Sequence, residues 1–309
     1  MKPPLDIVVV GGLNTDFLIR GPSLPEPGET IQGGEFLSAP GGKGANQAVV
    51  TARLGSRTAM IGKVGREPRG TDLIKALQKE RVNTRWIFRD AKTPTGAALI
   101  MVDQSGEKQI LASPGANEKL TQTELHKAAS ILKQCRVLML QFEVPMPVVV
   151  EAARLARRGR ARVVLDPAPA HPMPKELFEL VDFIRPNASE AEALTGCKVT
   201  DRASARKAAH QLLKRGIGAV GIQAGEAGDL LVTPDEEHWL PRVKVQTVDA
   251  TGAGDAFVAA MAVALSEGKS WLEAGRLANA TAALATTKFG AQAGLPTRAE
   301  AERLLCKVR

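Results

Sequence analysis

Short runs of β-branched and other apolar residues alternate along the chain with longer stretches whose apolar positions recur at helical spacing. This alternation predicts an α/β fold, in which helices cover both faces of a mostly parallel central sheet in an αβα three-layer sandwich. The predicted strands lie at residues 7–10, 58–61, 137–141, 162–165, 183–184 and 219–223. Helices are expected at residues 45–54, 71–81, 189–194 and 203–215, opening at Thr121, ending at Arg158, and beginning near Ala256, Trp271 and Thr297.

Two parts of the chain interrupt this rhythm with extended segments that no helix separates. They lie at about residues 15–40 and 84–113, and Gln104, Ser105 and Gly106 predict a hairpin turn within the second. We expect them to form a small β-sheet that projects as a lid from a single domain spanning residues 1–309.

Length and cysteine content add limits to this picture. A chain of 309 residues with 44% hydrophobic residues can bury a core without disulfides or metals. Its three cysteines are widely separated and lack CxxC spacing, so we expect reduced thiols. No stretch approaches the ~18 apolar residues of a membrane-spanning helix, and the N-terminal apolar run is too short for a signal peptide. These features predict a cytoplasmic protein with no membrane partner.

The formal net charge of +8 raises the question of a nucleic-acid partner. The densest basic run, Arg154 to Arg162, lies where a predicted helix ends, and there it complements the helix dipole. Aromatic residues make up only 4% of the chain, which disfavours binding of single strands by stacking. We therefore expect no nucleic-acid partner, since anionic small substrates suit the same charge.

The sharpest motif is the segment from Asp249 to Phe257, a glycine-rich turn followed at once by an apolar helix. The free N–H groups of a first helical turn, with the helix dipole, favour a phosphate, so this turn predicts an anion site. Asp255 at this position is ordinarily a helix cap. Beside a phosphate its carboxylate would repel the ligand, so we interpret it as a base that takes a hydroxyl proton during phosphoryl transfer.

A second glycine turn, Gly41 to Gly44, also opens a predicted helix. A flexible loop before an ordinary helix is the alternative interpretation, but Lys43 and Asn46 would project from a turn that admits close approach. Together with Asn14, Asp16 and Glu143, which follow predicted strands or lie near them, these groups suit a polyhydroxy ligand such as a sugar. Neither GxxxxGK[ST] nor GxGxxG occurs at its expected place, which excludes a P-loop NTPase and leaves a dinucleotide site unsupported.

These two turns resemble the two signatures of the ribokinase (phosphofructokinase-B-type) family of carbohydrate kinases. The resemblance runs essentially end to end and includes Pro27 to Thr30, Asp166 to Ala170 and Lys288 to Gln292. It implies ATP-dependent phosphorylation of the 5-hydroxyl of D-ribose, in a cleft between the αβα domain and a β lid that also pairs two subunits into a homodimer. In this family the matching positions bind the sugar at Asn14, Asp16, Gly42, Lys43, Gly44, Asn46, Glu143 and Asp255, with Asp255 as base and Gly252, Ala253 and Gly254 as anion hole.

The same resemblance assigns the nucleotide and two metal ions. ATP would lie against Asn187, Gln223, Gly225, Glu226, Gly228, Gly254 and Asn279. Mg²⁺ would be held, mostly through water, at Asn187 and Glu190, and K⁺ at Asp249, Thr251, Ala285, Lys288 and Gly290.

Three of these assignments carry a local complication. The spacing of Asn187 and Glu190 by itself favours a helix capping box. Gln223 replaces the Thr or Ser that is commoner in the family. Gly294 stands where ribokinases often carry Ser, so potassium activation is expected either to weaken or to rely on water.

Other substrates remain as alternatives within the family: deoxyribose, fructose, 2-keto-3-deoxygluconate or a nucleoside. Asn14 disfavours deoxyribose, because its polar side chain would lose a hydroxyl partner. Scarce aromatics disfavour a nucleoside, although Phe17 and Phe36 near the lid keep it open. A more remote alternative is a non-catalytic sugar or nucleotide sensor, which would be expected to have lost Asp255.

Overall fold

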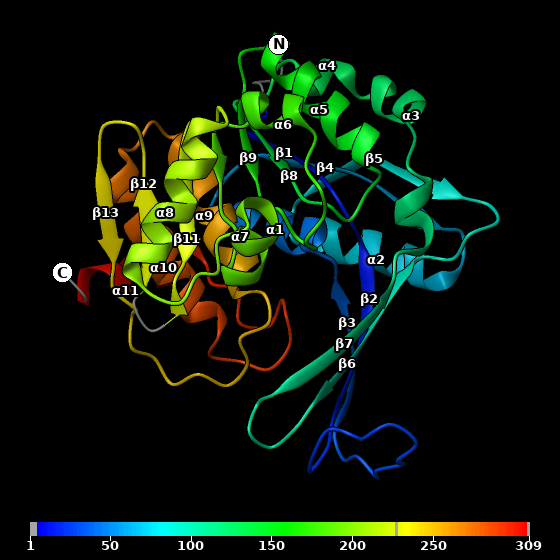
Figure 1. The fold of residues 1–309 in the computed structure, drawn as a ribbon. Helices are drawn as coiled ribbons and strands as arrows, with labels where there is room; N and C mark the ends of the chain where they lie inside the picture. Colours follow the sequence, from blue (N-terminus) through cyan, green and yellow to red (C-terminus); the bar gives the residue numbers. More distant parts are fainter. Residues whose placement is uncertain (1–4, 226–227, 308–309) are drawn as a thin grey trace.

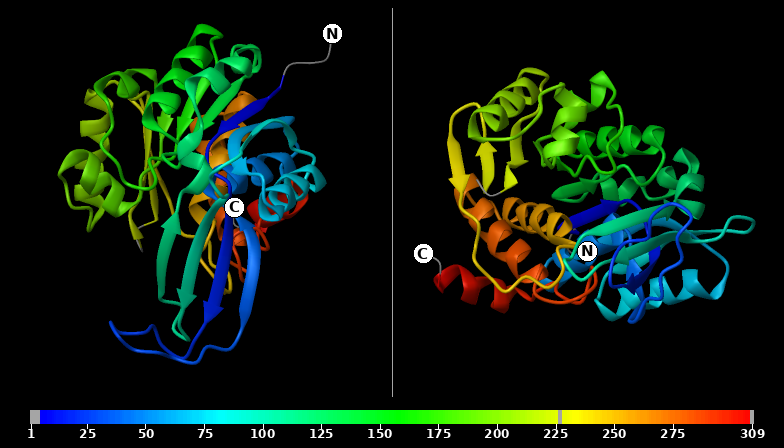
Figure 2. Two further views of the ribbon diagram at one scale, coloured as in Figure 1. Left: turned by 90° about the vertical axis from the view of Figure 1, so that its right-hand side faces the viewer. Right: turned by 60° about the horizontal axis from the view of Figure 1, so that its bottom comes forward.

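The computed structural model describes residues 5–225 and 228–307. One large sheet runs through the molecule, with helices on both faces (Figures 1 and 2). In spatial order its strands are β13 (Glu237–Leu240), β12 (Asp229–Val232), β11 (Ala219–Gln223), β10 (Phe183–Ile184), β9 (Arg162–Leu165), β8 (Val137–Leu140), β1 (Ile7–Val10), β4 (Thr58–Gly65) and β5 (Asn83–Asp90). Neighbours from β11 to β5 run parallel, whereas β12 and β13 form an antiparallel hairpin at one edge.

Two hydrophobic cores, one on each face of the sheet, hold the helices in place. One core is covered by α3 (Gln122–Lys127), α4 (Ala129–Leu132), α5 (Met146–Arg158), α6 (Lys175–Leu180), α7 (Ala188–Thr195) and α8 (Arg202–Lys214). The other is covered by α1 (Lys43–Arg53), α2 (Pro68–Lys79), α9 (Ala253–Ser266), α10 (Trp271–Ala285) and α11 (Arg298–Lys307). Within β1, Val8 and Val10 point to the first core and Ile7 and Val9 to the second, as the alternation of side chains along a strand requires. The predicted three-layer αβα sandwich is thus confirmed.

A separate small sheet projects from this body as the lid (Figure 1). Its strands, in spatial order, are β3 (Phe36–Gly41), β2 (Asn14–Arg20), β6 (Gly96–Val102) and β7 (Lys108–Ser113), and a short 3₁₀ helix, η1 (Gly115–Lys119), follows. The hairpin expected at residues 104–106 joins β6 to β7.

The predicted second lid segment, residues 84–113, begins too early. Residues 83–90 form β5, which pairs in parallel with β4 at the edge of the large sheet. The reason is packing on both faces of this strand: Ile87 belongs to the core beneath α1 and α2, whereas Trp86 and Phe88 pack against the opposite core. The lid therefore takes its second pair of strands only from Gly96 onward.

The structure also sharpens several local predictions. Both glycine turns open their helices a few residues earlier than expected, at Lys43 and Ala253, so the chemistry-bearing residues lie within the first helical turns. The three cysteines are free thiols. Within the described ranges, no helix is both long enough and apolar enough to cross a lipid bilayer.

Candidate active site

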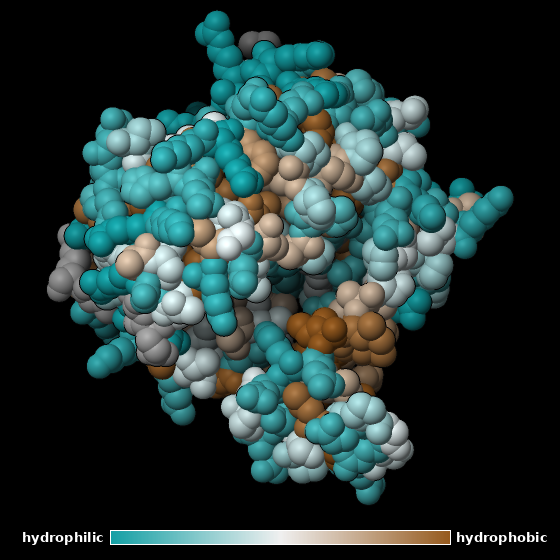
Figure 3. Space-filling view, viewed as in Figure 1, coloured by the Kyte–Doolittle hydropathy of each residue, from teal (hydrophilic) through white to brown (hydrophobic). Residues whose placement is uncertain are grey.

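A cleft of about 580 Å³ lies between the lid and the carboxyl ends of the parallel strands (Figure 3). Ligands of open α/β sheets bind at this edge. The cleft brings together most of the predicted sugar-binding and catalytic residues, which come from β2, the two glycine turns and the loops after β8, β9 and β10. Its lining includes Asn14, Asp16, Gly42, Lys43, Asn46, Glu143, Asn187, Glu190, Gln223, Thr251, Gly252, Gly254 and Asp255.

Asp255 lies in the first turn of α9 and is held by side chains of α1. Its Oδ2 accepts a hydrogen bond from Asn46 Nδ2 at 2.9 Å, and its Oδ1 accepts one from Gln47 Nε2 at 3.1 Å. The Asn46 amide is fixed in this orientation because its own oxygen accepts from Gln292 Nε2 at 3.0 Å. Burial raises the pKa of Asp255, against the opposing effect of the Lys43 ammonium. A carboxylate oriented in this way and with a raised pKa is suited to take a proton from a hydroxyl group.

Lys43 contacts three carboxyl groups of the cleft, those of Glu143, Asp166 and Asp255. Its backbone N–H donates to Glu143 Oε2 at 2.7 Å, and its Nζ lies 3.1 Å from Asp166 Oδ2 and 3.8 Å from Asp255 Oδ1. Although burial works to lower the pKa of Lys43, the carboxylates of Asp166 and Asp255 raise it above its usual value. The ammonium group is therefore positively charged and partly offsets the surrounding negative charge.

Asn14 is oriented by a side chain far away in the sequence. Asn117 accepts a hydrogen bond from the N–H of Leu13 at 3.0 Å, which fixes its amide group, and its Nδ2 then donates to Asn14 Oδ1 at 2.9 Å. The amide nitrogen of Asn14 consequently makes no hydrogen bond within the described residues and is a donor for a ligand oxygen. Asn14 lines the cleft, so this donor is open to the space that a ligand would fill.

Two carboxyl groups of the cleft are strongly affected by their burial. Burial, reinforced by the charge of Asp255, raises the pKa of Asp16 to about 7. Burial also raises the pKa of Glu143 to about 7, despite the nearby Lys43. Hydroxyl donors of a sugar would stabilise the ionised forms of both groups, because a carboxylate accepts hydrogen bonds at both of its oxygens.

The turn before α9 has the backbone conformation of an anion-binding site. Gly252 has a φ of 84°, and a Cβ there would lie 2.6 Å from the carbonyl oxygen of Ala291, so only glycine fits. The N–H groups of Gly254 and Asp255 have no acceptor in the part of the chain that the structure describes. Free N–H donors at a helix N-terminus are available to a phosphate. The N–H of Ala253, by contrast, donates to the carbonyl oxygen of Ala250 at 3.3 Å, so one of the three predicted anion-hole residues has its donor already bonded within the turn.

A second, smaller cavity of about 200 Å³ adjoins the cleft, with Arg185, Gln223 and Gly254 lining both. Gly225 and Asn279, two predicted nucleotide contacts, lie here. Gly228 is placed at the β11–β12 turn, where its N–H donates to the carbonyl of Gly225, but it lines neither cavity. Glu226 lies outside the described residues.

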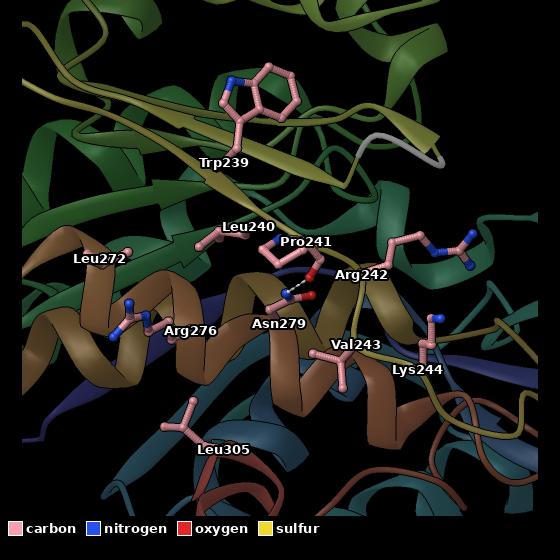
Figure 4. Close-up of a pocket in the computed structure, with 10 residues that line it drawn as sticks. All are labelled: Trp239, Leu240, Pro241, Arg242, Val243, Lys244, Leu272, Arg276, Asn279 and Leu305. Carbon is pink, nitrogen blue, oxygen red and sulfur yellow. Dashed lines mark hydrogen bonds between the residues drawn. The ribbon is translucent and has the colours of Figure 1, made fainter. Parts of the chain in front are cut away.

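Asn279 is held against the segment that follows β13. Its Nδ2 donates to the carbonyl of Pro241 at 2.6 Å (Figure 4). Beyond this contact, the segment borders an outer cavity of about 950 Å³, whose rim carries Arg242, Lys244 and Arg276. Asn279 lines both this cavity and the smaller one, so the cavity that holds the predicted nucleotide contacts adjoins a basic surface.

Asn187 and Glu190 form the capping box that their spacing suggests. Asn187 Oδ1 accepts from the N–H of Glu190, and Glu190 Oε2 accepts from the N–H of Asn187, both at 2.9 Å. The second carboxylate oxygen of Glu190 makes no hydrogen bond within residues 5–225 and 228–307, and the residue lines the cleft. No cluster of three metal-ligating side chains occurs among the described residues. One cleft-facing carboxylate fits Mg²⁺ that is held through water and substrate phosphates.

Two of the predicted potassium positions, Thr251 and Gly290, contact a third, Asp249. Its Oδ2 accepts from the N–H of Gly290 at 2.9 Å, and its Oδ1 accepts from the N–H of Thr251 at 2.9 Å. The two loops are thereby joined. A Cβ at Gly294 would lie 2.1 Å from the carbonyl oxygen of Ala285, so the serine that the family often carries does not fit this backbone.

The sequence analysis assigned no site role to four residues that build the site. Asn117 orients Asn14, while Gln47 donates to Asp166 at 3.0 Å as well as to Asp255. The guanidinium of Arg185 lies 4.3 Å from the Phe257 ring centre and 2.7 Å from Asp229 Oδ1, and its buried Nε has no partner within the described residues. Asp166 and Arg185 directly follow β9 and β10, and this position at a strand end was the available signal.

Comparison with known proteins gives one consistent result. A model of the pfkB family of carbohydrate kinases matches residues 4–298. The chain is 39% identical to a ribokinase of Haemophilus influenzae over 95% of this chain and 96% of that protein. It is 34% identical to a deoxyribokinase of Salmonella typhimurium, with 95% of this chain and 96% of that protein covered. A structure of Arabidopsis thaliana ribokinase complexed with ribose and ATP superposes with a TM-score of 0.88 at 31% identity, covering 98% of this chain and 99% of the other.

Proposed function

The chain belongs to the pfkB family of carbohydrate kinases, and on that premise we propose that it transfers the γ-phosphoryl group of ATP to the 5-hydroxyl of D-ribose. The observation that carries this proposal is the juxtaposition of Asp255 with the open N–H groups of its own helical turn. One group is placed to activate a hydroxyl oxygen, and the others are placed to bind the phosphoryl group that this oxygen attacks.

In the proposed reaction Asp255 takes the proton of the 5-hydroxyl as the O5–P bond forms. The bond from this phosphorus to the bridging oxygen breaks, and ADP leaves with the electron pair. Asn46 and Gln47 keep the carboxylate oriented, while Lys43 limits how far its pKa rises. The N–H groups of Gly254 and its neighbours in the turn stabilise charge on the transferred group.

The sugar would lie at the acceptor end of the cleft. The free amide donor of Asn14 pairs with one hydroxyl, and the carboxylates of Asp16 and Glu143 accept from others. Gly42 lets the ring approach the backbone of the turn, and Lys43 and Asn46 complete the polar wall. Gly44 does not line the cleft: a Cβ there would lie 2.7 Å from the backbone carbonyl carbon of Gly11, so this glycine lets α1 pack closely against the segment after β1. ATP would extend from the anion hole past Gln223 to Gly225 and Asn279 in the smaller cavity.

Two metal ions complete the proposal. Asn187 and Glu190 would hold Mg²⁺ through water, and a divalent ion there neutralises charge on the phosphates. Asp249, with the carbonyl groups of Thr251, Ala285, Lys288 and Gly290, would hold K⁺ behind the anion-hole turn and steady its conformation.

We also propose that two copies of the chain pair through the outer face of the lid, in the cytoplasm, where ATP is available. The exposed large apolar side chains of the described residues are concentrated on the lid. On its outer face Ile19, Phe36, Leu99 and Leu111 are 44%, 62%, 53% and 72% exposed. A contiguous apolar face of this kind favours association. Sedimentation of the wild type and of Leu111→Lys tests the pairing, which is wrong if the wild type is a monomer.

Deoxyribose is the second candidate acceptor, because a deoxyribokinase is among the similar proteins. A coupled ADP-release assay with ATP, Mg²⁺ and K⁺ distinguishes the candidates when run with ribose, 2-deoxyribose, fructose, 2-keto-3-deoxygluconate, adenosine and uridine. The proposal requires the highest kcat/KM with ribose. A preference for another acceptor would retain the phosphoryl-transfer chemistry and overturn the ribose assignment, whereas no ADP release with any acceptor would favour a sensor.

A further inference from the structure

The cleft carries more negative than positive side chains, although the group transferred within it is itself an anion. Its lining contains five carboxylates and three cations: Asp16, Glu143, Asp166, Glu190 and Asp255 against Lys43, Lys108 and Arg185. Phosphoryl transfer needs positive charge near the oxygens of the transferred group. At least one of these three cations must therefore be free to approach the transferred phosphoryl group.

Two of these cations already face carboxylates. Lys43 Nζ lies 3.1 Å from Asp166, and the Arg185 guanidinium lies 2.7 Å from Asp229. Lys108 differs from both, because its single hydrogen-bond partner among the described residues is a neutral hydroxyl group. Its Nζ donates to Thr251 Oγ1 at 3.1 Å. The charge of Lys108 is therefore not offset by a carboxylate within hydrogen-bonding distance.

The contact of Lys108 spans the cleft from the lid to the anion-hole turn. Lys108 is the first residue of β7 and faces Val102 of β6, on the side of the lid that borders the cleft. Thr251 directly precedes Gly252. The hydroxyl of Thr251 donates to Asp249 Oδ1 at 2.7 Å, which leaves its lone pairs free to accept from Lys108. The ammonium group is thus held at the edge of the turn whose N–H groups are open.

We propose that Lys108 is the cation that the lid contributes to phosphoryl transfer. As the O5–P bond forms and the bond to the bridging oxygen of ADP breaks, its ammonium group donates hydrogen bonds to the transferred phosphoryl oxygens, while the proton goes to Asp255. Lys108 forms no covalent bond and gives up no proton. The inference rests on the proposed phosphoryl transfer, but it does not depend on which sugar is the acceptor.

This placement links closure of the lid to the chemical step. The lid covers the acceptor with the inner face of β6 and β7, and the same strands carry the cation to the anion-hole turn. An open lid would remove the positive charge from the site. ATP bound without a sugar would then lie in a site that lacks the ammonium group of Lys108. Its absence disfavours transfer of the phosphoryl group to water.

The test compares Lys108→Met, which keeps the aliphatic stem, with Lys108→Arg, which keeps the charge. Lys92→Met is the matched control, since Lys92 is an exposed lysine that lines no part of the cleft. We expect Lys108→Met to lower kcat by about 10- to 100-fold with the preferred sugar while sugar binding, measured by calorimetry, changes less than about threefold. Lys108→Arg should recover most of the rate, and Lys92→Met should match the wild type.

Two further readouts separate a charge effect from a structural one. The rate ratio of wild type to Lys108→Met should shrink when choline chloride is added at constant K⁺, because added salt screens an exposed charge. Binding of a non-hydrolysable ATP analogue in the presence of sugar should also weaken by about fivefold in Lys108→Met. This second measurement needs no turnover, so it tests Lys108 even if the ribose assignment fails. Equal kcat and equal analogue binding in wild type and Lys108→Met would overturn the proposal.

Discussion

The two glycine turns at the cleft have similar backbone conformations, but the N–H groups of the helices that follow them have different hydrogen-bond partners. Gly42 and Gly252 both precede a helix with φ near 90°, at 90° and 84°, and neither helix has a side-chain cap. At α1, two N–H groups of the first turn donate to other parts of the protein. The N–H of Lys43 donates to Glu143, and the N–H of Ala45 donates to the carbonyl of Gly12. At α9 the N–H groups of Gly254 and Asp255 stay open within the described residues.

On the proposed function, the same motif, a glycine turn before a helix, contacts the sugar at α1 and the phosphates of ATP at α9. The α1 turn contributes side chains above all: Lys43, Asn46 and Gln47 donate to the carboxyl groups of Asp166 and Asp255. Among the first-turn donors of α1, the N–H of Gly44 has no acceptor within the described residues. The α9 turn instead keeps the N–H groups of Gly254 and Asp255 open, which favours an anion as its ligand. We therefore expect changes at the α9 turn to affect the chemical step and changes at the acceptor end to affect sugar binding.

Asp255→Asn should give the largest effect, since it removes the base at the point where the two helices meet. We expect kcat to fall by about 10³-fold, within the range typical for a lost general base, while sugar affinity measured by calorimetry is largely retained. The acid limb of the wild-type kcat profile, which reflects protonation of Asp255 as the pH falls, should disappear. Turnover of Asp255→Asn within about tenfold of the wild type would rule out this role.

Gly252→Ala tests the open turn directly. The new Cβ would press on the Ala291 carbonyl, and the positive φ would become strained, so we expect kcat to fall by about 10²-fold. Gly268→Ala is the matched control: its φ is 76°, but a Cβ there meets no atom within 4 Å. That variant should lose about 1 kcal/mol of unfolding free energy and no activity. Equal kcat in the two variants would show that the turn is not the anion site.

Asn14→Ala tests the acceptor end. Loss of its amide donor should raise the sugar KM by about tenfold, with a smaller change in kcat, and should narrow the preference for ribose over 2-deoxyribose. Both parameters come from steady-state rates with each sugar. An unchanged ratio of kcat/KM for the two sugars would remove Asn14 from the sugar site.

Asp16→Asn should give the smallest change in kcat. It should raise the sugar KM, because a carboxylate acceptor is lost, and it should also change the stability of the ligand-free protein. The folded chain keeps the proton of Asp16 up to a pKa of about 7, whereas an unfolded aspartate releases it near pH 4. The folded state thus binds more protons in this interval, and the free energy of unfolding falls as the pH rises from about 4 to 7. Without ligand, the Asn variant should be more stable than the wild type by about 1 kcal/mol at pH 8 and equal to it at pH 4. Urea denaturation at both pH values measures this difference, and a variant less stable at pH 8 would contradict the assigned burial cost.

Local patterns were enough to predict the fold class, the glycine turns and the position of Asp255, because each depends on residues close together in the sequence. The pattern of residues 84–90 predicted a strand but did not predict which sheet the strand joins, because an extended segment can pair with either sheet. The packing of Trp86 and Ile87 against the two cores places this strand in the large sheet. Asn117 was missed for a similar reason. It lies 103 residues from Asn14 and carries no motif of its own, so its role depends entirely on the tertiary structure.

The connection between the two sheets has a mechanical consequence. The central strand β1 passes into the lid strand β2 through residues 11–13 alone. These residues do not line the cleft, but they support residues that do: the Gly12 carbonyl accepts from the first turn of α1, and the Leu13 N–H fixes Asn117, which orients Asn14. If the lid moves by a change of backbone conformation at residues 11–13, the same change disturbs the side chains that these residues hold at the sugar site. We therefore expect the product to dissociate when the lid opens. Hydrogen exchange at the Leu13 amide should then accelerate in step with product dissociation, and exchange independent of the bound sugar would separate the two events.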